Sequence, residues 1–572
     1  MTGTIMNFIL MLHSHLPYVL NHGRWPHGSD WLTEAALDTY LPLLENLRAL
    51  EAQGTAVPLT IGITPVLANQ LTSPLFVEEL EEFFAQRLAA CDEAPASLAT
   101  TGDAHLQPLV GYWRSRFERL RDLFHDVNGD LVGAFGDLER RGMIEIVSSA
   151  ATHGFLPLLA RDESIRLQLG LGHAEHRRLF GRDPAGCWLP ECGYRPRGRW
   201  APLPEAPHPG TRAGIEAHLE WAGFRYFFTD AHLAHAGDAL GTYADVPLGA
   251  ERFDAERHDI PSARVSEVER SPYRAYRVAS TKRGPSAICL VRDPRSSLQV
   301  WSRQQGYPGD EWYLDFHKIR WPGGLKFWRV SGPDVDLGDK RPYDPVRAIE
   351  RVGSHADHFA HLLSGIAAAH AGADDAVVVA PFDTELFGHW WYEGVDFVAA
   401  LVSRLAGRGE VRPVTASGHL AAHPPTNVIR LAAGSWGANG DNSMWLNDGT
   451  RWMWQRLWPL EDAFWDAAPR ALASDALRPI VAQAARQLVL AQSSDWPFII
   501  STGAVANYGA DRFNLHVDDA TRLVQALAPD APASVCEAAR QSAATLSERD
   551  HLFSDILPAV ERALIARPAR AG

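Results

Sequence analysis

Seven short apolar runs recur along this chain, and their number and order constrain the fold more than any other feature. They are FILMLHSH (8–15), VPLTIGIT (57–64), MIEIVSSA (143–150), AGCWLPE (185–191), FRYFFTD (224–230), AICLVRD (287–293) and AVVVAPFD (376–383). Runs that are apolar throughout are typical of parallel strands covered on both faces. Seven such strands separated by helical sequence favour an α/β fold, an incomplete (β/α)7 barrel, over a doubly wound sheet.

The polar residues of these runs gather at one end of each run. Five of the seven runs close with His, Glu or Asp. Enzymes built on (β/α) barrels assemble their active sites at the carboxyl ends of several strands at once. The pattern therefore predicts an active site at this edge of the sheet.

A long interval between the second and third runs has the pattern of an inserted helical region at about 74–140. About eighty residues are too many for one crossover between neighbouring strands. Apolar positions recur there at spacings of four, three and four, with charged residues between them, at Trp113, Phe117, Leu120 and Phe124. This spacing is typical of amphipathic helices.

Two further changes in pattern divide the rest of the chain. The interval at about 231–286 is rich in Pro, Arg, Gly and Ser, and we expect it to form a lid-like excursion above the barrel mouth. The strand pattern stops near residue 420, where a helical apolar pattern follows. We therefore expect a catalytic barrel at 1–420 and, at 421–572, a C-terminal α-helical domain that contributes to the active-site cleft.

Charge and composition narrow the choice of partners. The 572 residues include 54 Lys plus Arg against 69 Asp plus Glu, a formal net charge of −15. This balance argues against nucleic acid or an anionic membrane as the main partner. A neutral ligand such as a sugar fits better, because the 19 Trp residues supply flat apolar faces with a polar edge.

Cysteine usage and the N-terminal run indicate the compartment. Five scattered Cys residues, an odd number, favour reduced thiols over a disulfide framework. The first apolar run has no Lys or Arg before it and is interrupted by His13 and His15, so we interpret it as a strand and not as a signal peptide. No stretch reaches the roughly 18 consecutive apolar residues of a membrane span. We therefore expect a cytoplasmic protein.

Two carboxylates at strand ends are the candidate catalytic groups. Glu191 follows an apolar run in GCWLPECGY, and Asp383 leaves a strand in VVVAPFDTELFGHWWYEG. Glycoside chemistry needs such a pair, because one carboxylate attacks or stabilises the anomeric carbon while the other protonates the leaving oxygen. The alternative is local: Asp383 or Thr384 caps the next helix and Glu385 lies in its first turn.

Three histidines accompany the carboxylates. His13 and His15 point to the same face of the first strand, and His153 follows the third. They are interpreted as hydrogen-bonding partners for ligand hydroxyls, as metal ligands, or as histidines satisfied in a polar pocket. Because no H-x-x-x-H or H-x-x-E-H signature supplies a further ligand, hydroxyl binding is favoured and no metal is expected.

Aromatic residues on loops complete the candidate cleft. Trp301 lies in SLQVWSRQQGYPGDEWYLDFH, Trp436 and Trp445 lie in GSWGANGDNSMWLN, and Asp495 and Trp496 lie in SSDWPFIISTG. The loop Trp residues have no helical or strand period, so a core stripe does not explain them.

The motifs HSHLP, GMIEIVSSAATHGFLPLL, GCWLPECGY, APFDTELFGHWW and SSDWPFI together resemble the five characteristic regions of glycoside hydrolase family 57, in their order. Within that family the chain resembles the 1,4-α-glucan branching enzymes of actinobacterial type. The resemblance implies the incomplete barrel with its helical insertion and C-terminal helices. It further implies a retaining double displacement with Glu191 as nucleophile and Asp383 as general acid/base, and no metal or other cofactor.

The same resemblance assigns the remaining site residues. It implies sugar binding by His13, His15 and His153. It implies glucan stacking by Trp301, Trp436 and Trp445. Asp495 and Trp496 would form part of the cleft wall, and Tyr243 would be a lid residue. The implied substrate is an α-1,4-glucan such as amylose, a glycogen-like polymer or a specialised polysaccharide.

Other activities also fit the residues. Family 57 includes α-amylases and 4-α-glucanotransferases, which share the first half of the reaction. A metal-dependent polysaccharide deacetylase would use strand-end histidines on a similar barrel, and a non-catalytic glucan-binding protein would use the aromatic loops alone.

Overall fold

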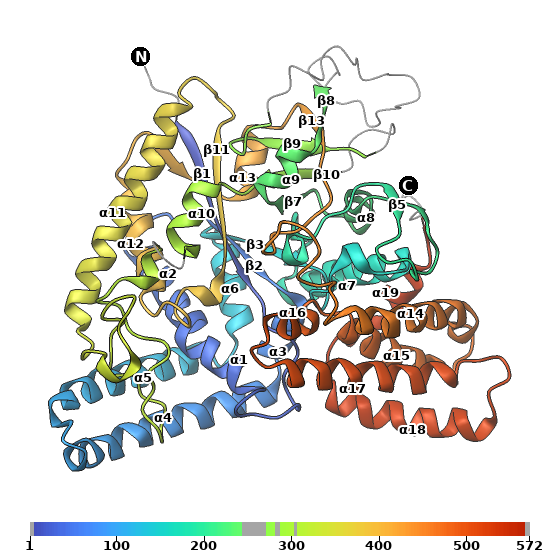
Figure 1. Cartoon of the computed structure of the whole chain (residues 1–572), viewed down its shortest axis with the longest axis horizontal. Coiled ribbons are helices and arrows are strands. Elements are labelled where there is room, and N and C mark those ends of the chain that lie inside the picture. The colour runs from blue at the N-terminus through green and yellow to red at the C-terminus, as the bar shows by residue number, and fades with distance from the viewer. Residues whose placement is uncertain (1–4, 243–269, 281–286, 303–305, 567–572) are drawn as a thin grey trace.

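The structure is a computed structural model that describes residues 5–242, 270–280, 287–302 and 306–566 (Figure 1). Tyr243, the expected lid residue, lies outside the described residues, as does most of the expected excursion. Parallel strands and barrel helices form one part of the molecule, and the C-terminal helices pack beside them (Figure 1).

Seven parallel strands form the centre of the fold. Six lie within predicted runs, and β1 begins two residues before its run. In the sheet they follow the order β11, β1, β2, β3, β4, β7, β10. Their bounds are β1 (Met6–Ser14), β2 (Leu59–Ile63), β3 (Ile144–Ser149), β4 (Gly186–Trp188), β7 (Tyr226–Thr229), β10 (Ala287–Val291) and β11 (Val377–Asp383). A parallel bridge between Arg292 and Val379 brings the end of β10 back to β11. The sheet therefore curls into the incomplete barrel that the sequence predicts.

The two faces of each strand have different neighbours. Along β1, Ile9 and Met11 belong to the cluster that fills the barrel interior, whereas Phe8, Leu10 and Leu12 pack toward the surrounding helices. Successive side chains of a strand point to opposite faces, and burial on both faces explains the absence of alternating polarity in these runs.

Helices cover the outside of the curled sheet. They are α1 (Asp30–Ala35), the π-helical turn η1 (Ala36–Tyr40), α2 (Leu41–Ala52), α3 (Pro65–Leu71), α7 (Asp162–Phe180), α8 (Ile215–Ala222), α9 (Ala231–Ala236), α10 (Pro294–Trp301), α11 (Pro345–Ala369), α12 (Gly394–Ala406) and α13 (Ala416–Ala422). The interval at 74–140 is helical, as predicted, with α4 (Pro74–Thr100), α5 (Gln107–Asp126) and α6 (Leu131–Arg140). Long helices α4 and α5 lie side by side at the lower left of Figure 1.

The sheet continues beyond β10 with strands that the sequence did not reveal. They are β8 (Asp238–Thr242), β9 (Ala275–Val278) and β13 (Asn427–Arg430), while β12 (Val411–Pro413) pairs with β1 and β5 (Gly198–Trp200) pairs with β6 (Gly210–Arg212). The expectation that strands stop near residue 420 was wrong, because β13 pairs with β8 and β9. This strand has two buried residues flanked by half-buried ones, so it shows no apolar run.

The C-terminal part is helical, as predicted. Its helices are α14 (Arg451–Leu472), α15 (Arg478–Ala491), α16 (Asp495–Thr502), α17 (Ala506–Gln525), α18 (Ala533–Arg549) and α19 (Ile556–Ala563). Two buried indoles of α14 attach it to the barrel: Trp458 Nε1 donates to the Leu158 carbonyl at 2.9 Å, and Trp465 Nε1 donates to Ser164 Oγ at 2.8 Å. Among the described helices, none combines the length and the apolar character that a bilayer crossing requires.

Candidate active site

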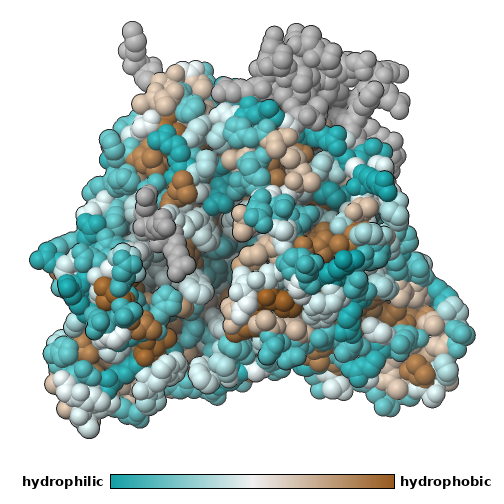
Figure 2. All heavy atoms as spheres, in the orientation of Figure 1, coloured by the Kyte–Doolittle hydropathy of each residue, from teal (hydrophilic) through white to brown (hydrophobic). Residues whose placement is uncertain are grey.

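The carboxyl ends of the parallel strands meet the C-terminal helices at a common edge. The surface is hollowed near the middle of Figure 2, where Figure 1 places α16 beside the strands. Strand register brings His13 of β1 directly beside Asp383 of β11. Both occupy the same alternate positions as Ile9, Met11, Val377 and Val379, which face the interior. The predicted His13 and Asp383 therefore share the inner face at this edge.

Glu191 reaches the site through an unusual backbone turn. Strand β4 ends at Trp188, and the short turn Pro190–Cys192 places Glu191 at φ 59° and ψ 23°. A left-handed conformation is uncommon for residues other than glycine and persists where surrounding contacts hold it. The Trp436 N–H donates to the Glu191 carbonyl at 3.0 Å and is one such contact.

Two donors hold the Glu191 carboxylate. Trp436 Nε1 donates to Oε2 at 2.8 Å, and Ser494 Oγ donates to Oε1 at 3.0 Å. The side chain is 16% exposed. Burial raises the pKa of this carboxyl, while both hydrogen bonds oppose that shift by stabilising the ionised form. Their geometry suits a carboxylate whose oxygens are oriented and charged.

Asp383 is buried like Glu191 but differs from it in the neighbours of its carboxyl group. Burial raises the pKa of its carboxyl well above the ordinary value, the charges of Glu385 and Glu191 raise it further, and Arg292 opposes them. Its side chain makes no helix-capping hydrogen bond to the following turn, so the capping alternative does not account for it. A protonated Asp383 beside an ionised Glu191 is the division of roles that paired carboxylates need for acid catalysis.

A chain of hydrogen bonds runs from His13 to Glu191. His13 Nε2 lies 3.1 Å from His153 Nε2, and His153 Nδ1 lies 2.9 Å from Ser494 Oγ. Because the Ser494 hydroxyl donates to Glu191, it accepts from His153 Nδ1–H, and His153 Nε2 then accepts from His13. Burial lowers the pKa of both histidines, which keeps the two rings neutral.

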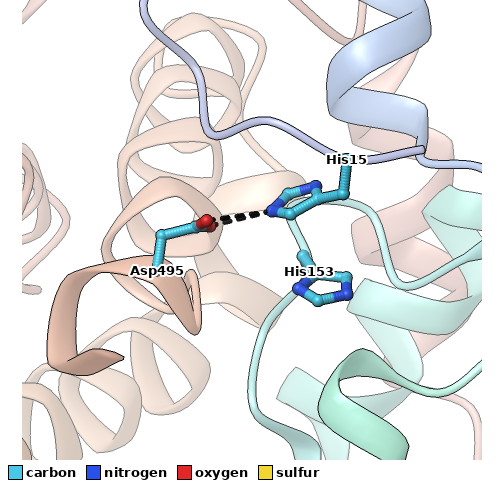
Figure 3. A group of neighbouring side chains, drawn as sticks. All are labelled: His15, His153 and Asp495. Carbon is cyan, nitrogen blue, oxygen red and sulfur yellow. Dashed lines mark hydrogen bonds and ion pairs between the residues drawn. The ribbon is translucent and has the colours of Figure 1, made fainter. Parts of the chain in front are cut away.

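His15 and Asp495 form a second pair that joins the barrel to α16. His15 Nε2 lies 2.9 and 3.1 Å from the two carboxylate oxygens of Asp495. Although burial opposes the charged imidazole, Asp495 raises the pKa of His15; burial likewise opposes ionisation of Asp495, but His15 lowers its pKa. Figure 3 shows His15 pointing toward Asp495, with the His153 ring next to it. The His15 and His153 rings stack at 4.0 Å.

These three residues are also the candidate metal group among the described residues. One ligand atom from each of His15, His153 and Asp495 lies within 4.8 Å of the others. A metal ligand must offer a free lone pair. Both His153 nitrogens are engaged, with His13 and Ser494, and His15 Nε2 contacts Asp495 directly. The arrangement fits a hydrogen-bonded polar floor better than a metal centre.

Two of the predicted aromatic residues lie together over Glu191. Trp436 packs edge-on against Trp188 at 4.9 Å and against Trp301 at 6.1 Å, and the Arg292 guanidinium lies 5.5 Å from its ring centre. Trp301 is 40% exposed. The pair presents indole surface at the mouth of the site.

Comparison with known proteins places this site in a family. A family model described as glycosyl hydrolase family 57 matches residues 9–432, which is more than half of the chain. The chain belongs to glycosyl hydrolase family 57. A second model, described as the C-terminal part of 1,4-alpha-glucan branching enzymes, matches residues 458–560.

Individual family 57 proteins resemble the chain over most of its length. A 1,4-alpha-glucan branching enzyme of Thermococcus kodakarensis is 38% identical over 521 residues, which is 90% of this chain and 73% of that protein. Its crystal structure in complex with glucose superposes with a TM-score of 0.85, covering 100% of this chain and 98% of that one at 35% identity. A probable 1,4-alpha-glucan branching enzyme of Mycobacterium tuberculosis is 30% identical over 571 residues, 96% of each chain. An α-amylase from Thermotoga maritima superposes with a TM-score of 0.78 at 26% identity, covering 98% of this chain and 99% of that one.

Two of the aromatic residues expected to contact substrate are buried in this family 57 structure. Trp445 is fully buried and stacks on Phe155 at 4.4 Å, nearly parallel, so no ring face is open to a glucose unit. Trp496 is also fully buried, and its Nε1 donates to the Leu490 carbonyl at 2.8 Å. The prediction that Trp445 stacks on the glucan was therefore wrong, and the Trp496 side chain, which was assigned to the cleft wall, lies in the core. Trp445 lies in an irregular segment that packs into the core, so the absence of a helical period did not imply an exposed indole there, and Trp496 lies on the buried side of α16.

Sequence reasoning missed the residues that support the predicted ones. Ser494 stands next to Asp495 in SSDWPFI, yet the signal for its role is spatial, because Glu191 lies 303 positions earlier. Glu385 accepts the His15 backbone N–H at 3.1 Å and the Tyr40 hydroxyl, and burial raises the pKa of its carboxyl to about 7. Glu385 thus fixes the backbone at His15, directly after the end of β1.

Proposed function

We propose that this family 57 chain catalyses α-1,4-glucan branching by a retaining double displacement, with Glu191 as nucleophile and Asp383 as general acid/base. The observation that carries the proposal is the contrast between the two carboxyl groups. Trp436 and Ser494 donate to Glu191, which favours its ionised form, whereas burial and neighbouring carboxylates favour the protonated form of Asp383. Retaining glycosidases need this pairing of an ionised nucleophile with a protonated acid.

In the first half of the reaction, a Glu191 oxygen attacks the anomeric carbon of an α-1,4-linked glucose. The bond from that carbon to the 4-oxygen of the next glucose breaks, and the Asp383 proton passes to the departing oxygen. The products are a glucosyl ester on Glu191, an ionised Asp383 and a shortened chain with a free 4-hydroxyl.

In the second half, an acceptor hydroxyl replaces the departed chain. Asp383 takes the proton of a glucan 6-hydroxyl, that oxygen attacks the anomeric carbon, and Glu191 leaves as a carboxylate. The net result is an α-1,6 branch with retained configuration. If water enters instead, the same steps give hydrolysis.

The surrounding residues have binding roles in this proposal. In this proposal the His15–Asp495 pair offers polar atoms to the hydroxyls of the glucose at the cleavage point, and His13 and His153, which bond each other and Ser494, form the polar floor beneath it. Trp301 and Trp436 offer ring surface for the glucan chain. The substrate class is α-1,4-glucan, such as amylose or a glycogen-like polymer.

The likeness to the Thermotoga maritima α-amylase makes hydrolysis the second candidate. The match of residues 458–560 to the branching-enzyme C-terminal model, together with the named branching-enzyme relatives, favours transfer. Incubation of amylose with the purified protein, followed by enzymatic debranching and chain-length measurement, separates the two. New chains released only after debranching support branching; new reducing ends without α-1,6 linkages would support the amylase.

A further inference from the structure

A small pocket with several charged groups lies beside the loop that follows Asp383, since His389 of that loop lines it, and the reaction steps above do not use it. The cavity has a volume of about 60 Å³ and is lined by Asp38, Lys326, His389, Phe316 and Trp321, among others. This volume accommodates water or a protruding hydroxymethyl group and is too small for a whole glucose ring. Apolar side chains make up most of the lining, and Glu34 and Arg87 are its further charged groups.

The π-helical turn η1 connects this pocket to the active site. Tyr40, its last residue, donates to Glu385, which in turn holds the His15 backbone N–H. Asp38, two positions earlier on the same turn, lines the pocket. Single π-helical turns inserted in α-helices are frequent at functional sites, since they re-aim side chains that a regular helix would place elsewhere. The pocket therefore lies next to the loop that follows Asp383, the proposed acid/base.

That loop also presents one exposed indole, which packs on a phenylalanine ring. Trp390, seven residues after Asp383, is 55% exposed, and its ring lies 4.4 Å from the Phe316 ring at an angle of 32°. The following residue, Trp391, is fully buried in the core. Two adjacent indoles thus have opposite environments. The core does not account for Trp390, whose large exposed ring is of the kind that binding sites use.

The polar groups of the pocket suit a neutral ligand with hydroxyls. Asp38 Oδ2 lies 3.5 Å from Lys326 Nζ and 3.7 Å from His389 Nδ1. The charges are of both signs and face one another, so an ionic ligand would have to break an existing pair. His389 Nδ1 is buried and has no hydrogen-bond partner within the described residues, because 3.7 Å exceeds hydrogen-bonding distance. It is available to a ligand hydroxyl.

The position of this surface indicates which sugar it would hold. The general acid/base protonates the leaving oxygen and later deprotonates the incoming hydroxyl, so sugars beyond Asp383 belong to the leaving and acceptor chains. Trp390 and His389 follow Asp383 on the same loop, whereas Trp301 and Trp436 lie over Glu191. The two aromatic surfaces are therefore assigned to different chains.

We propose that Trp390, Phe316 and the pocket of Asp38, Lys326 and His389 form the binding site for the acceptor glucan. The inference rests on the proposed branching function and adds to it the place where the second chain is held. A glucose ring of the acceptor stacks on the exposed face of Trp390, whose other face rests on Phe316, and a hydroxyl from it enters the pocket. Holding the 6-hydroxyl of this chain near Asp383 also keeps water from taking its place.

The test compares Trp390→Ala with the conservative Trp390→Phe. The quantity measured is the number of α-1,6 branches formed per α-1,4 bond cleaved, from debranching and reducing-end assays on amylose. We expect Trp390→Ala to lower this ratio about tenfold, since truncating a stacked Trp commonly costs at least this factor in binding. Trp390→Phe retains a flat ring and should stay within about twofold of wild type.

Trp452→Ala is the matched control, because Trp452 is a half-buried indole of α14 in the C-terminal helices. Its ratio should equal that of wild type, and thermal unfolding of all variants checks that each is folded. An unchanged ratio in Trp390→Ala, or an equal loss of cleavage and branching, would overturn the acceptor assignment. A wild-type protein that cleaves amylose without forming branches would overturn the proposed function itself, and with it this inference.

Discussion

At the scale of single residues, the two carboxyl groups acquire different roles from their neighbours. Glu191 is held by Trp436 and Ser494, whereas Asp383 is buried beside other carboxylates. A covalent step and a proton-transfer step cannot be performed by the corresponding amides.

Glu191→Gln and Asp383→Asn should therefore each lower turnover on amylose by about a thousandfold or more, as removal of a catalytic group commonly does. Initial rates from reducing-end and branching assays measure the effect. Unfolding temperatures should stay close to that of wild type, because each change keeps the side-chain shape. The surface variant Glu93→Gln on α4 serves as the control, and near wild-type turnover in either site variant would remove that residue from the mechanism.

Ser494 should set the acid limit of activity. Glu191 has to be ionised to attack; burial raises its pKa and the Ser494 hydroxyl lowers it. In Ser494→Ala the pKa of Glu191 should rise further, so the acid limb of the pH profile of kcat/KM should move to higher pH. A hydrogen bond to a charged group contributes about 1.5–3 kcal/mol, which corresponds to a shift of about one to two pH units.

The control for this shift is Ser501→Ala on α16, the helix that Ser494 precedes, since the Ser501 hydroxyl accepts a hydrogen bond from Asn447 Nδ2. An acid limb that stays in place in Ser494→Ala would mean that the serine does not govern ionisation of Glu191.

The histidine cluster should work without a bound metal, because both His153 nitrogens already take part in hydrogen bonds. We expect full branching activity after dialysis against excess chelator, measured beside an undialysed sample. Loss of activity on chelation and its return with an added divalent cation would contradict this and revive the deacetylase alternative.

The sequence predicted many of these residues because they end apolar runs or lie in recognisable motifs. It could not predict the positive φ of Glu191 or the Ser494 contact, since both depend on segments that meet only in the folded chain. The burial of Trp445 and Trp496 was equally hidden, because their neighbours Phe155 and Leu490 are identified only by packing.

At the scale of elements, the His15–Asp495 pair joins the end of β1 to the first turn of α16. His15 has a raised pKa, so its contribution to stability is complete below the unfolded pKa of about 6.5 and is lost as pH rises through the folded value. Asp495 has a lowered pKa, so its contribution is complete above about 3.9 and is lost as pH falls through the folded value. The ion pair should therefore stabilise this junction most between about pH 4 and 6.5.

Asp495→Asn tests this junction. The difference in unfolding temperature between wild type and the variant should be largest between about pH 4 and 6.5 and should shrink at higher pH, where His15 loses its proton. Thermal unfolding followed by circular dichroism at several pH values measures it. A difference that does not change with pH would show that the pair does not stabilise the folded state through its charges.

The strands themselves were predictable because burial on both faces leaves continuous apolar runs, as in β1 and β11. The short strand β13 was not, since its two buried residues form no run, and its pairing with β8 and β9 is a long-range event. The local sequence pattern therefore predicted the seven parallel strands and missed the strands that extend the sheet.

At the scale of the whole molecule, the active site is complete only when the C-terminal helices are in place. They supply Ser494 and Asp495, and the Ser494 backbone N–H donates to the His153 carbonyl at 3.0 Å. The sequence predicted that this domain contributes to the cleft, but the residues that fix its position, Trp458 and Trp465, looked like ordinary apolar positions of a helix.

Trp458→Ala should therefore affect both stability and catalysis. Loss of this fully buried indole removes its bond to Leu158 and opens a cavity, which costs about 3–5 kcal/mol. Because the segment from His153 to Leu158 and the start of α16 pack on this junction, Ser494 should move relative to Glu191 and turnover should fall at temperatures where the variant is still folded. Phe124→Ala, in the helical insertion, is the comparison: it also empties a buried aromatic site, but on α5, which packs with α4 and α2. Turnover per folded molecule, with the folded fraction taken from thermal unfolding, should drop in Trp458→Ala and stay near wild type in Phe124→Ala. Equal turnover in the two variants would show that the position of the C-terminal helices does not control the site.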